Sequence, residues 1–294
     1  MGAPDPRLNL YGKQDFRIGR QLRSYGKADP PSTRVRPVPI QLIHAVFAEA
    51  QRLASPESIC LGYMAYVAFF YLMRPGEYCI SGDEPHPFRL RDVRLWIGTR
   101  QLDPCRAPFA ILRRATFSGL VFTDQKNCVR GELIGHGRSG ALYACPVRAL
   151  VELVIRLRTA GGSPTTPLCS FRPRGSTILH HLTAEAFTEA LRAQARICGE
   201  TFGVKPSDIS ARSFRNAGAM ALLCAGIDCD RIGLVGRWKS GAMLRYLLVQ
   251  AKPVMRGFAP AMLRGGNMEL IPSDAEFLQI PSADPRDPYA GDPY

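Results

Sequence analysis

The chain has 294 residues, of which 46% are hydrophobic and 21% charged, so it has enough apolar material to bury a core and is not a disordered tail. No apolar run approaches the roughly 20 residues of a membrane span, and the N-terminal sequence MGAPDPRLNLYGK lacks the apolar stretch of a secretion signal. These features exclude a membrane-spanning protein and predict a reducing, intracellular compartment.

The nine cysteines are scattered along the chain without a Cys-x-x-Cys pair, and none of the five histidines pairs with a cysteine at metal-ligand spacing. This usage argues against a disulfide framework, a zinc knuckle and a structural metal. We therefore predict neither a metal nor a cofactor.

The formal net charge of +13 is the first indication of a partner. Six of the 38 basic residues are lysine and 32 are arginine, whose planar fork matches phosphate oxygens in pairs. Residues 267–294 contain six acidic residues and one arginine, so the rest of the chain is more basic than the average. The composition favours a polyanionic partner; a basic charge that serves solubility alone is the other interpretation.

The first part of the chain divides into three patterns. Residues 1–37 mix Pro, Gly, Arg and Lys without periodicity, which predicts a flexible basic arm. From 38 to about 73 the pattern is helical, and its second half, CLGYMAYVAFFYLM, is apolar on most faces until Pro75 and Gly76 break it. Residues 88–134 hold short β-branched or aromatic runs between turn residues, which predicts a small antiparallel sheet.

Helical patterns then return. PVRALVELVIRLRTA begins at Pro146, and after a predicted loop over 161–177 a second helix has Thr183 as its N-cap. Three more helices are predicted in SARSFRNAGAMALLCAG, in DCDRIGLVG with Asp228 as cap, and in SGAMLRYLLV with Ser240 as cap.

The fold class that follows is α+β and mainly helical, with a small antiparallel sheet between helical halves. We assign this single domain to residues 38–266. The acidic, proline-rich segment 267–294 has no periodic apolar face, which predicts a flexible tail.

The most informative string runs from Ser210 to Val249, SARSFRNAGAMALLCAGIDCDRIGLVGRWKSGAMLRYLLV. An arginine opens a small-residue helix, an Ala-Gly-Ile-Asp turn follows, a short helix ends in Gly-Arg-Trp, and a tyrosine lies one helix later. This order resembles the C-terminal half of the catalytic domain of tyrosine recombinases, the phage-integrase family, and especially its eukaryotic crypton-like and retroelement members. Upstream, LMRPGE resembles the family's first arginine motif, and FTDQKNCVRGE resembles the hairpin that carries its lysine.

Metal-independent cleavage of a phosphodiester requires cations that hold the non-bridging oxygens, a nucleophile and a proton donor. The resemblance implies that Arg74 and Arg215 hold the phosphate. Glu77, about one helical turn after Arg74, is placed to orient its guanidinium. The alternative for each arginine is a surface or salt-bridged side chain, and for Glu77 a solvated carboxylate.

The resemblance implies that Tyr246 is the nucleophile and forms a 3′-phosphotyrosine. A phenol with a pKa near 10 needs neighbouring cations that favour the phenolate. Lys126, at the tip of the predicted hairpin, is the candidate that protonates the leaving 5′-oxygen. No other lysine falls between Lys27 and Lys205. A packing tyrosine and a solvated turn lysine remain the alternatives.

Two departures from the family pattern stand out. Where many members have His-x-x-Arg, this chain has Arg212 before Arg215, a fixed cation that can hold phosphate but cannot exchange a proton at neutral pH. The family's later His or Trp position falls on Trp238 when counted from Arg215 and on Arg237 when counted from Tyr246. We prefer Trp238, whose indole N–H can donate to a phosphate oxygen, with Arg237 in a supporting role; a Trp238 that packs a helix seam is the alternative.

The resemblance therefore implies a DNA recombinase or integrase of a transposable element such as a crypton. It would act in the nucleus on double-stranded DNA as a homo-oligomer, a tetramer, without metal, ATP or cofactor. The main alternative is a domesticated DNA-binding protein that keeps the fold and has lost strand cleavage. A type IB topoisomerase and a basic scaffold without a nucleic-acid role are further alternatives.

Overall fold

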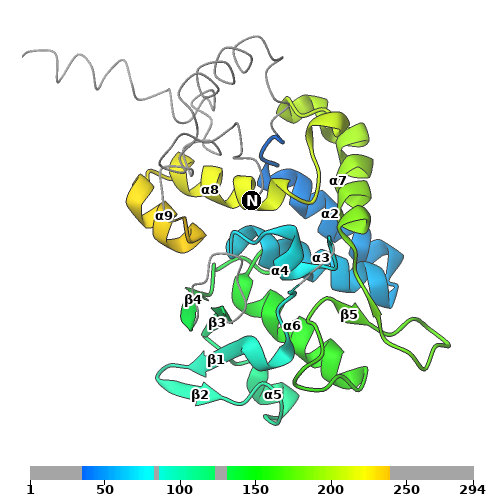
Figure 1. Ribbon diagram of the computed structural model, residues 1–294, viewed down its shortest axis with the longest axis vertical. Helices are drawn as coiled ribbons and strands as arrows, with labels where there is room; N and C mark the ends of the chain where they lie inside the picture. Colours follow the sequence, from blue (N-terminus) through cyan, green and yellow to red (C-terminus); the bar gives the residue numbers. More distant parts are fainter. Residues whose placement is uncertain (1–34, 83–85, 123–130, 239–294) are drawn as a thin grey trace, which may run out of the picture. The chain divides into compact units, whose positions relative to one another are not determined.

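The computed structural model describes residues 35–82, 86–122 and 131–238. They belong to one compact unit formed by residues 1–247, and a second unit, residues 248–294, lies outside the described residues. The described chain combines helices with a small antiparallel sheet, as predicted (Figure 1). None of its helices has both the length and the apolar character needed to cross a bilayer.

The described α-helices are, in chain order, α2 (Ile40–Leu53), α3 (Pro56–Phe70), α4 (Pro75–Tyr78), α5 (Phe109–Leu112), α6 (Pro146–Thr159), α7 (Ala184–Cys198), α8 (Ser213–Cys224) and α9 (Cys229–Gly236). The strands are β1 (Val93–Ile97), β2 (Arg100–Leu102), β3 (Phe117–Phe122), β4 (Glu132–Gly137), β5 (Ser170–Phe171) and β6 (His180–His181). Single 3₁₀ turns are η1 (Leu90–Asp92), η2 (Glu200–Phe202) and η3 (Pro206–Asp208).

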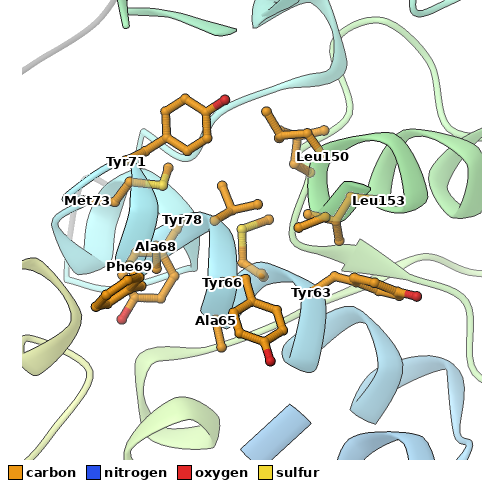
Figure 2. Close-up of a cluster of buried hydrophobic side chains, with 14 of the residues drawn as sticks. Tyr63, Ala65, Tyr66, Ala68, Phe69, Tyr71, Met73, Tyr78, Leu150 and Leu153 are labelled. Carbon is orange, nitrogen blue, oxygen red and sulfur yellow. The ribbon is translucent and has the colours of Figure 1, made fainter. Parts of the chain in front are cut away.

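Helix α3 forms the centre of the core, because its side chains are apolar on nearly every face. Ser55 caps it by accepting the N–H of Ser58 at 3.0 Å, and Pro56 occupies its first turn. α2 packs against one side and α6 against another. Figure 2 shows this cluster, in which tyrosines and alanines of α3 lie alongside Leu150 and Leu153 of α6.

The end of α3 corrects the sequence prediction. The helix ends at Phe70 and not at the Pro75–Gly76 break, because Leu72 adopts the left-handed conformation (φ 49°). The N–H of Met73 donates to the carbonyl of Ala68 (3.0 Å), and the N–H of Leu72 donates to that of Phe69 (3.3 Å). These two bonds form a Schellman motif, which closes a helix end by its backbone geometry and needs no proline.

The main sheet has the order β2-β1-β3-β4, and every neighbouring pair is antiparallel. Val93, Leu95, Leu120 and Phe122 point from it into the core. The short helix α5 interrupts the predicted strand region between β2 and β3. The β3–β4 pairing runs from Phe117↔Gly137 to Phe122↔Glu132, so the predicted hairpin is present.

The predicted loop over 161–177 contains a strand that the sequence did not reveal. Ser170 and Phe171 form β5 and pair with His181 and His180 of β6. Two-residue strands are too short to show a hydrophobic period, so only the pairing defines them.

Two of the three predicted caps of the later helices are confirmed. Thr183 accepts the N–H of Ala186 (3.2 Å) at the start of α7, and Asp228 accepts that of Arg231 (2.8 Å) at the start of α9. Ser240 lies outside the described residues. At the end of the predicted arm, the N–H of Arg36 donates to the carbonyl of Asp208 at 2.8 Å.

Candidate functional site

Three chain segments that are distant in sequence meet just beyond the C-terminal end of α3. They are the turn and helix α4 over 71–78, the start of α8, and the end of α9. We call the set formed by Arg74, Glu77, Arg215, Arg237 and Trp238 the arginine cluster. All five are residues that the sequence analysis singled out.

Arg215 joins all three segments. Its Nη1 donates to the carbonyl of Leu72 at 2.7 Å, and its Nη2 donates to the carbonyl of Gly236. The centre of its guanidinium lies 4.2 Å from the centroid of the Trp238 ring, a cation–π contact. Only 5% of the residue is exposed. Arg215 therefore stacks on the side chain that the sequence predicted for the family's His or Trp position.

α8 can bring Arg215 to this point because a glycine lies one turn further along. A Cβ at Gly218 would collide with the carbonyl of Phe69, so α8 approaches the end of α3 more closely than a larger residue would allow. Tyr78 adds a second connection, since its hydroxyl donates to the carbonyl of Ala211 at 2.6 Å just before α8. Burial raises the pKa of Tyr78, so this hydroxyl keeps its proton.

Arg237 ends α9 in the same way that Leu72 ends α3. It is left-handed (φ 59°), and the N–H of Trp238 donates to the carbonyl of Gly233 at 3.0 Å, which forms a second Schellman motif. Its Nη1 donates to the carbonyl of Tyr71 (3.2 Å), and its Nη2 donates to that of Leu72 (3.3 Å). The free carbonyls at the end of α3 are thus bonded by guanidinium groups.

Glu77 is the carboxylate of the cluster and lies between two arginines. Its Oε2 accepts Arg237 Nη2 at 3.0 Å and the backbone N–H of Arg74 at 2.9 Å, and its Oε1 lies 3.3 Å from Arg74 Nη1. Glu77 is 6% exposed and the Arg74 side chain 31% exposed. The prediction that Glu77 orients the Arg74 guanidinium agrees with this contact, and Glu77 also pairs with Arg237.

Charge within the cluster is unbalanced. The cluster holds three guanidiniums and one carboxylate, Glu77, which pairs with Arg74 and Arg237. Its five members therefore carry a formal excess of two positive charges, and the Glu132 carboxylate also acts on Arg237. Burial lowers the pKa of Arg237, and the Glu77 carboxylate acts in the opposite direction. Of the three guanidiniums, that of Arg74 is the most exposed, so it is the one best placed to meet an anion from solution.

Backbone strain coincides with the cluster. Among the described residues other than glycine, three have positive φ: Ala54, Leu72 and Arg237. Two of these three meet here, through the Leu72 carbonyl that accepts both Arg215 and Arg237. Such conformations cost of order 1 kcal/mol or more and persist where the surroundings hold them, as at many functional sites.

The remaining predicted site residues are not members of the arginine cluster. Arg212 is exposed at the start of α8, three residues before Arg215, and its N–H donates to Ser210 Oγ at 3.3 Å. Lys126 and Tyr246 lie outside the described residues. The described ends next to Lys126 are Phe122 and Gly131.

Phe122 was not singled out from the sequence, yet it contacts the cluster. The guanidinium carbon of Arg237 lies 3.8 Å from the centroid of the Phe122 ring, at the last described position of β3. The hairpin predicted to carry Lys126 is therefore attached to the cluster at its base. A phenylalanine at the end of an apolar strand gives no sequence sign of this role, and neither do the backbone carbonyls of Tyr71 and Leu72.

The string GHGRSG over 135–140 has the Gly-x-Gly-x-x-Gly spacing of dinucleotide-binding turns. The structure gives these glycines a different setting. Gly135 and Gly137 belong to β4, a Cβ at Gly135 would collide with the Phe117 ring, and α6 begins only at Pro146. The strand-to-helix turn that would hold a pyrophosphate is therefore lacking.

No protein-family model and no curated protein matches the sequence. Within the described ranges, no group of three or more His, Cys, Asp or Glu side chains is arranged to hold a metal ion.

Proposed function

We propose that the protein cleaves and rejoins double-stranded DNA through a 3′-phosphotyrosine, as a member of the tyrosine recombinase class. The supporting observation is the meeting of Arg74, Glu77, Arg215, Arg237 and Trp238 at one place, although about 140 residues separate Arg74 from Arg215. The resemblance assigns roles to residues in these same three segments.

In the proposed reaction the Tyr246 phenolate attacks the phosphorus. The bond from phosphorus to the 5′-oxygen breaks, and Lys126 gives that oxygen a proton. The phosphotyrosine conserves the energy of the bond, so attack by a 5′-hydroxyl reverses the step without ATP. The cationic cluster stabilises the charge that develops on the non-bridging oxygens.

Within this scheme the arginines have different roles. Arg74, the most exposed of them, contacts the phosphate, and exposed Arg212 adds a second cation from the start of α8. Buried Arg215 and Arg237 raise the local positive potential and hold α8 and α9 against the end of α3. Glu77 fixes Arg74 by its 3.3 Å contact.

The net charge of +13 supports binding to the DNA backbone, with an affinity that falls steeply with salt. As the resemblance implies, the proposal includes assembly as a tetramer on DNA and action in the nucleus, as in the integration of a transposable element.

A second candidate is a DNA-binding protein that has lost strand cleavage. The observation that favours it is the state of Arg215, whose two Nη atoms are bonded to backbone carbonyls in a buried position. Arg212, in place of the family's histidine, also favours this candidate, because an arginine cannot exchange a proton at neutral pH.

A nicked suicide duplex distinguishes these functions. The full chain is incubated with the duplex and the covalent adduct is resolved on a denaturing gel. The proposal expects an adduct with wild type and none with Tyr246→Phe. Tyr143→Phe, at an exposed tyrosine beside Arg148, is the matched control and should retain the adduct.

The other outcomes are equally informative. DNA binding without an adduct in any variant supports the second candidate. An equal adduct from wild type and Tyr246→Phe excludes Tyr246 as the nucleophile. Absence of DNA binding at low salt contradicts both candidates.

A further inference from the structure

A second group of arginines lies near the other end of α3. Arg113, Arg156 and Arg172 line a cavity of about 420 Å³ together with Glu152, and Pro56 and Cys60 of the first half of α3 form part of its wall. Helix α3 is roughly 22 Å long at 1.5 Å per residue. This arginine pocket is therefore separate from the arginine cluster, which lies beyond the far end of the helix.

One arginine of the pocket is already paired. Arg113 Nε, at the end of α5, lies 3.2 Å from Glu152 Oε1 of α6. The pocket lining thus holds three guanidiniums and one carboxylate, an excess of two positive charges. Glu57 is a neighbouring carboxylate that lines the adjoining cavity, which shares Pro56 and Phe171 with this pocket.

The other two guanidiniums are exposed, and their contacts with the described part of the chain involve no carboxylate. Arg156 lies over the Tyr63 ring, with its guanidinium carbon 5.7 Å from the centroid. Arg172 lies against Gly161, where a Cβ would be only 3.1 Å from its Nη2. Gly161 also has φ +79°, a conformation suited to glycine, so the chain leaves room for the Arg172 fork there.

The floor of the pocket is mostly apolar. Pro56, Ile155 and Phe171 line it. Two hydroxyl groups of the lining donate to backbone carbonyls of the protein. The Thr159 hydroxyl donates to the carbonyl of Ile155 at 2.9 Å, and that of Ser170 donates to the carbonyl of Pro167 at 2.7 Å. A pocket lined by apolar side chains and arginine forks accommodates a ligand that has an anionic end and an organic body.

We propose that the arginine pocket binds a phosphate monoester. A monoester is close to a dianion at neutral pH, which matches the charge excess of two, and arginine forks bind its oxygens in pairs. The volume is within the usual range for a small-molecule site and admits a nucleoside monophosphate. The inference is independent of the proposed strand cleavage, because it uses no residue of the arginine cluster.

Calorimetric titration of the full chain tests the proposal with thymidine 5′-monophosphate, inorganic phosphate and thymidine as probes. The monophosphate is expected to bind wild type more tightly than inorganic phosphate does, and thymidine is expected to give no measurable binding. Arg156→Gln combined with Arg172→Gln should weaken monophosphate binding by about tenfold or more, since two charged hydrogen-bonding groups are lost.

The matched control combines Arg106→Gln with Arg196→Gln. It removes the same charge from exposed arginines that pair with Asp103 and Glu189 at the surface, and it should bind as wild type does. Arg172→Lys, which keeps the charge and loses the fork, should also bind more weakly, and it decides the question if the double variant does not fold.

Three results would overturn the proposal. One is equal binding of the monophosphate to wild type and to the folded pocket variants. Another is the absence of binding to wild type at millimolar monophosphate. The third is equal loss in the control variant, which would mean that only total charge matters.

Discussion

The arginines of this protein occupy two contrasting environments. Arg215 and Arg237 are buried and donate mainly to backbone carbonyls at the ends of α3 and α9. Arg52 and Arg231 are exposed and pair with a carboxylate three residues earlier on their own helix or its cap. The first pair connects distant segments and the second pair connects nothing beyond one turn. Charge alone therefore does not tell which arginine organises the molecule; burial and the identity of the acceptors do.

Replacing the carboxylate of the cluster gives the largest expected effect. Glu77→Gln leaves Arg237 buried without its counter-charge, and breaking a buried pair in this way costs about 3–5 kcal/mol of unfolding free energy. Urea unfolding followed by circular dichroism measures the loss. Glu49→Gln, which breaks the exposed pair with Arg52, should leave the unfolding midpoint nearly unchanged. If both substitutions shift it equally, the contrast between buried and exposed arginines is wrong.

The second-largest loss of stability is expected when the forked guanidinium of Arg215 is replaced. In Arg215→Lys the single ammonium cannot reach the carbonyls of Leu72 and Gly236 together, so one buried hydrogen bond of a charged group is lost, at a cost of about 2 kcal/mol. The same unfolding experiment applies, with Arg52→Lys as the surface control. A lysine variant as stable as wild type would show that charge, and not the fork, is what this position needs.

The stacking of Arg215 on Trp238 should contribute less. A double-mutant cycle of Arg215→Met and Trp238→Leu isolates the pair, and a partly buried cation–π contact at 4.2 Å predicts a coupling of about 1 kcal/mol. Zero coupling in the cycle would mean that Trp238 only fills space beside α8.

A fall in pH is expected to have the smallest effect on stability. It acts through His136, a histidine beside the core, and not through an arginine. Burial lowers the pKa of His136, which packs edge-on against Tyr71 with ring centroids 4.7 Å apart. Since the unfolded chain then binds the proton more readily, stability is kept above the ordinary pKa of 6.5 and is lost as the pH falls below it.

Thermal unfolding at about pH 7.5 and about pH 5.5 measures this dependence. His136→Phe should reduce the acid loss without removing it, because burial also lowers the pKa of His44 and of His181. His86→Gln, at an exposed histidine, is the control. An unchanged acid loss in His136→Phe would exclude His136 as a contributor.

Much of the candidate site could be singled out from the sequence because its residues lie in motifs that resemble those of tyrosine recombinases. Arg74 belongs to the LMRPGE motif, and Arg237 was reached by counting back from Tyr246 along the family pattern. Phe122 and the carbonyl of Leu72 could not be found in this way. One is an ordinary strand residue, and the other is a backbone atom that any residue would supply.

Local rules predicted the longer helices, the caps at Thr183 and Asp228, and the place of the sheet, since each depends on neighbours within a few residues. The short helices α4 and α5 were not predicted. The end of α3 was misplaced because a left-handed leucine closes it, a conformation that leucine does not favour on its own.

By itself the sequence determined an α+β chain, rich in arginine and basic, with the starts of α7 and α9 marked by their capping residues. Tertiary structure alone decided which arginines are buried, that Glu77 pairs with Arg237 as well as with Arg74, and that Arg156 and Arg172 share a pocket. The physical reason is range: caps and periodicity act along one or two turns. The carbonyl partners of Arg215, and those of Arg237 at the end of α3, in contrast, lie from 21 to 166 residues away, and they come within reach only when α8 and α9 pack on the end of α3.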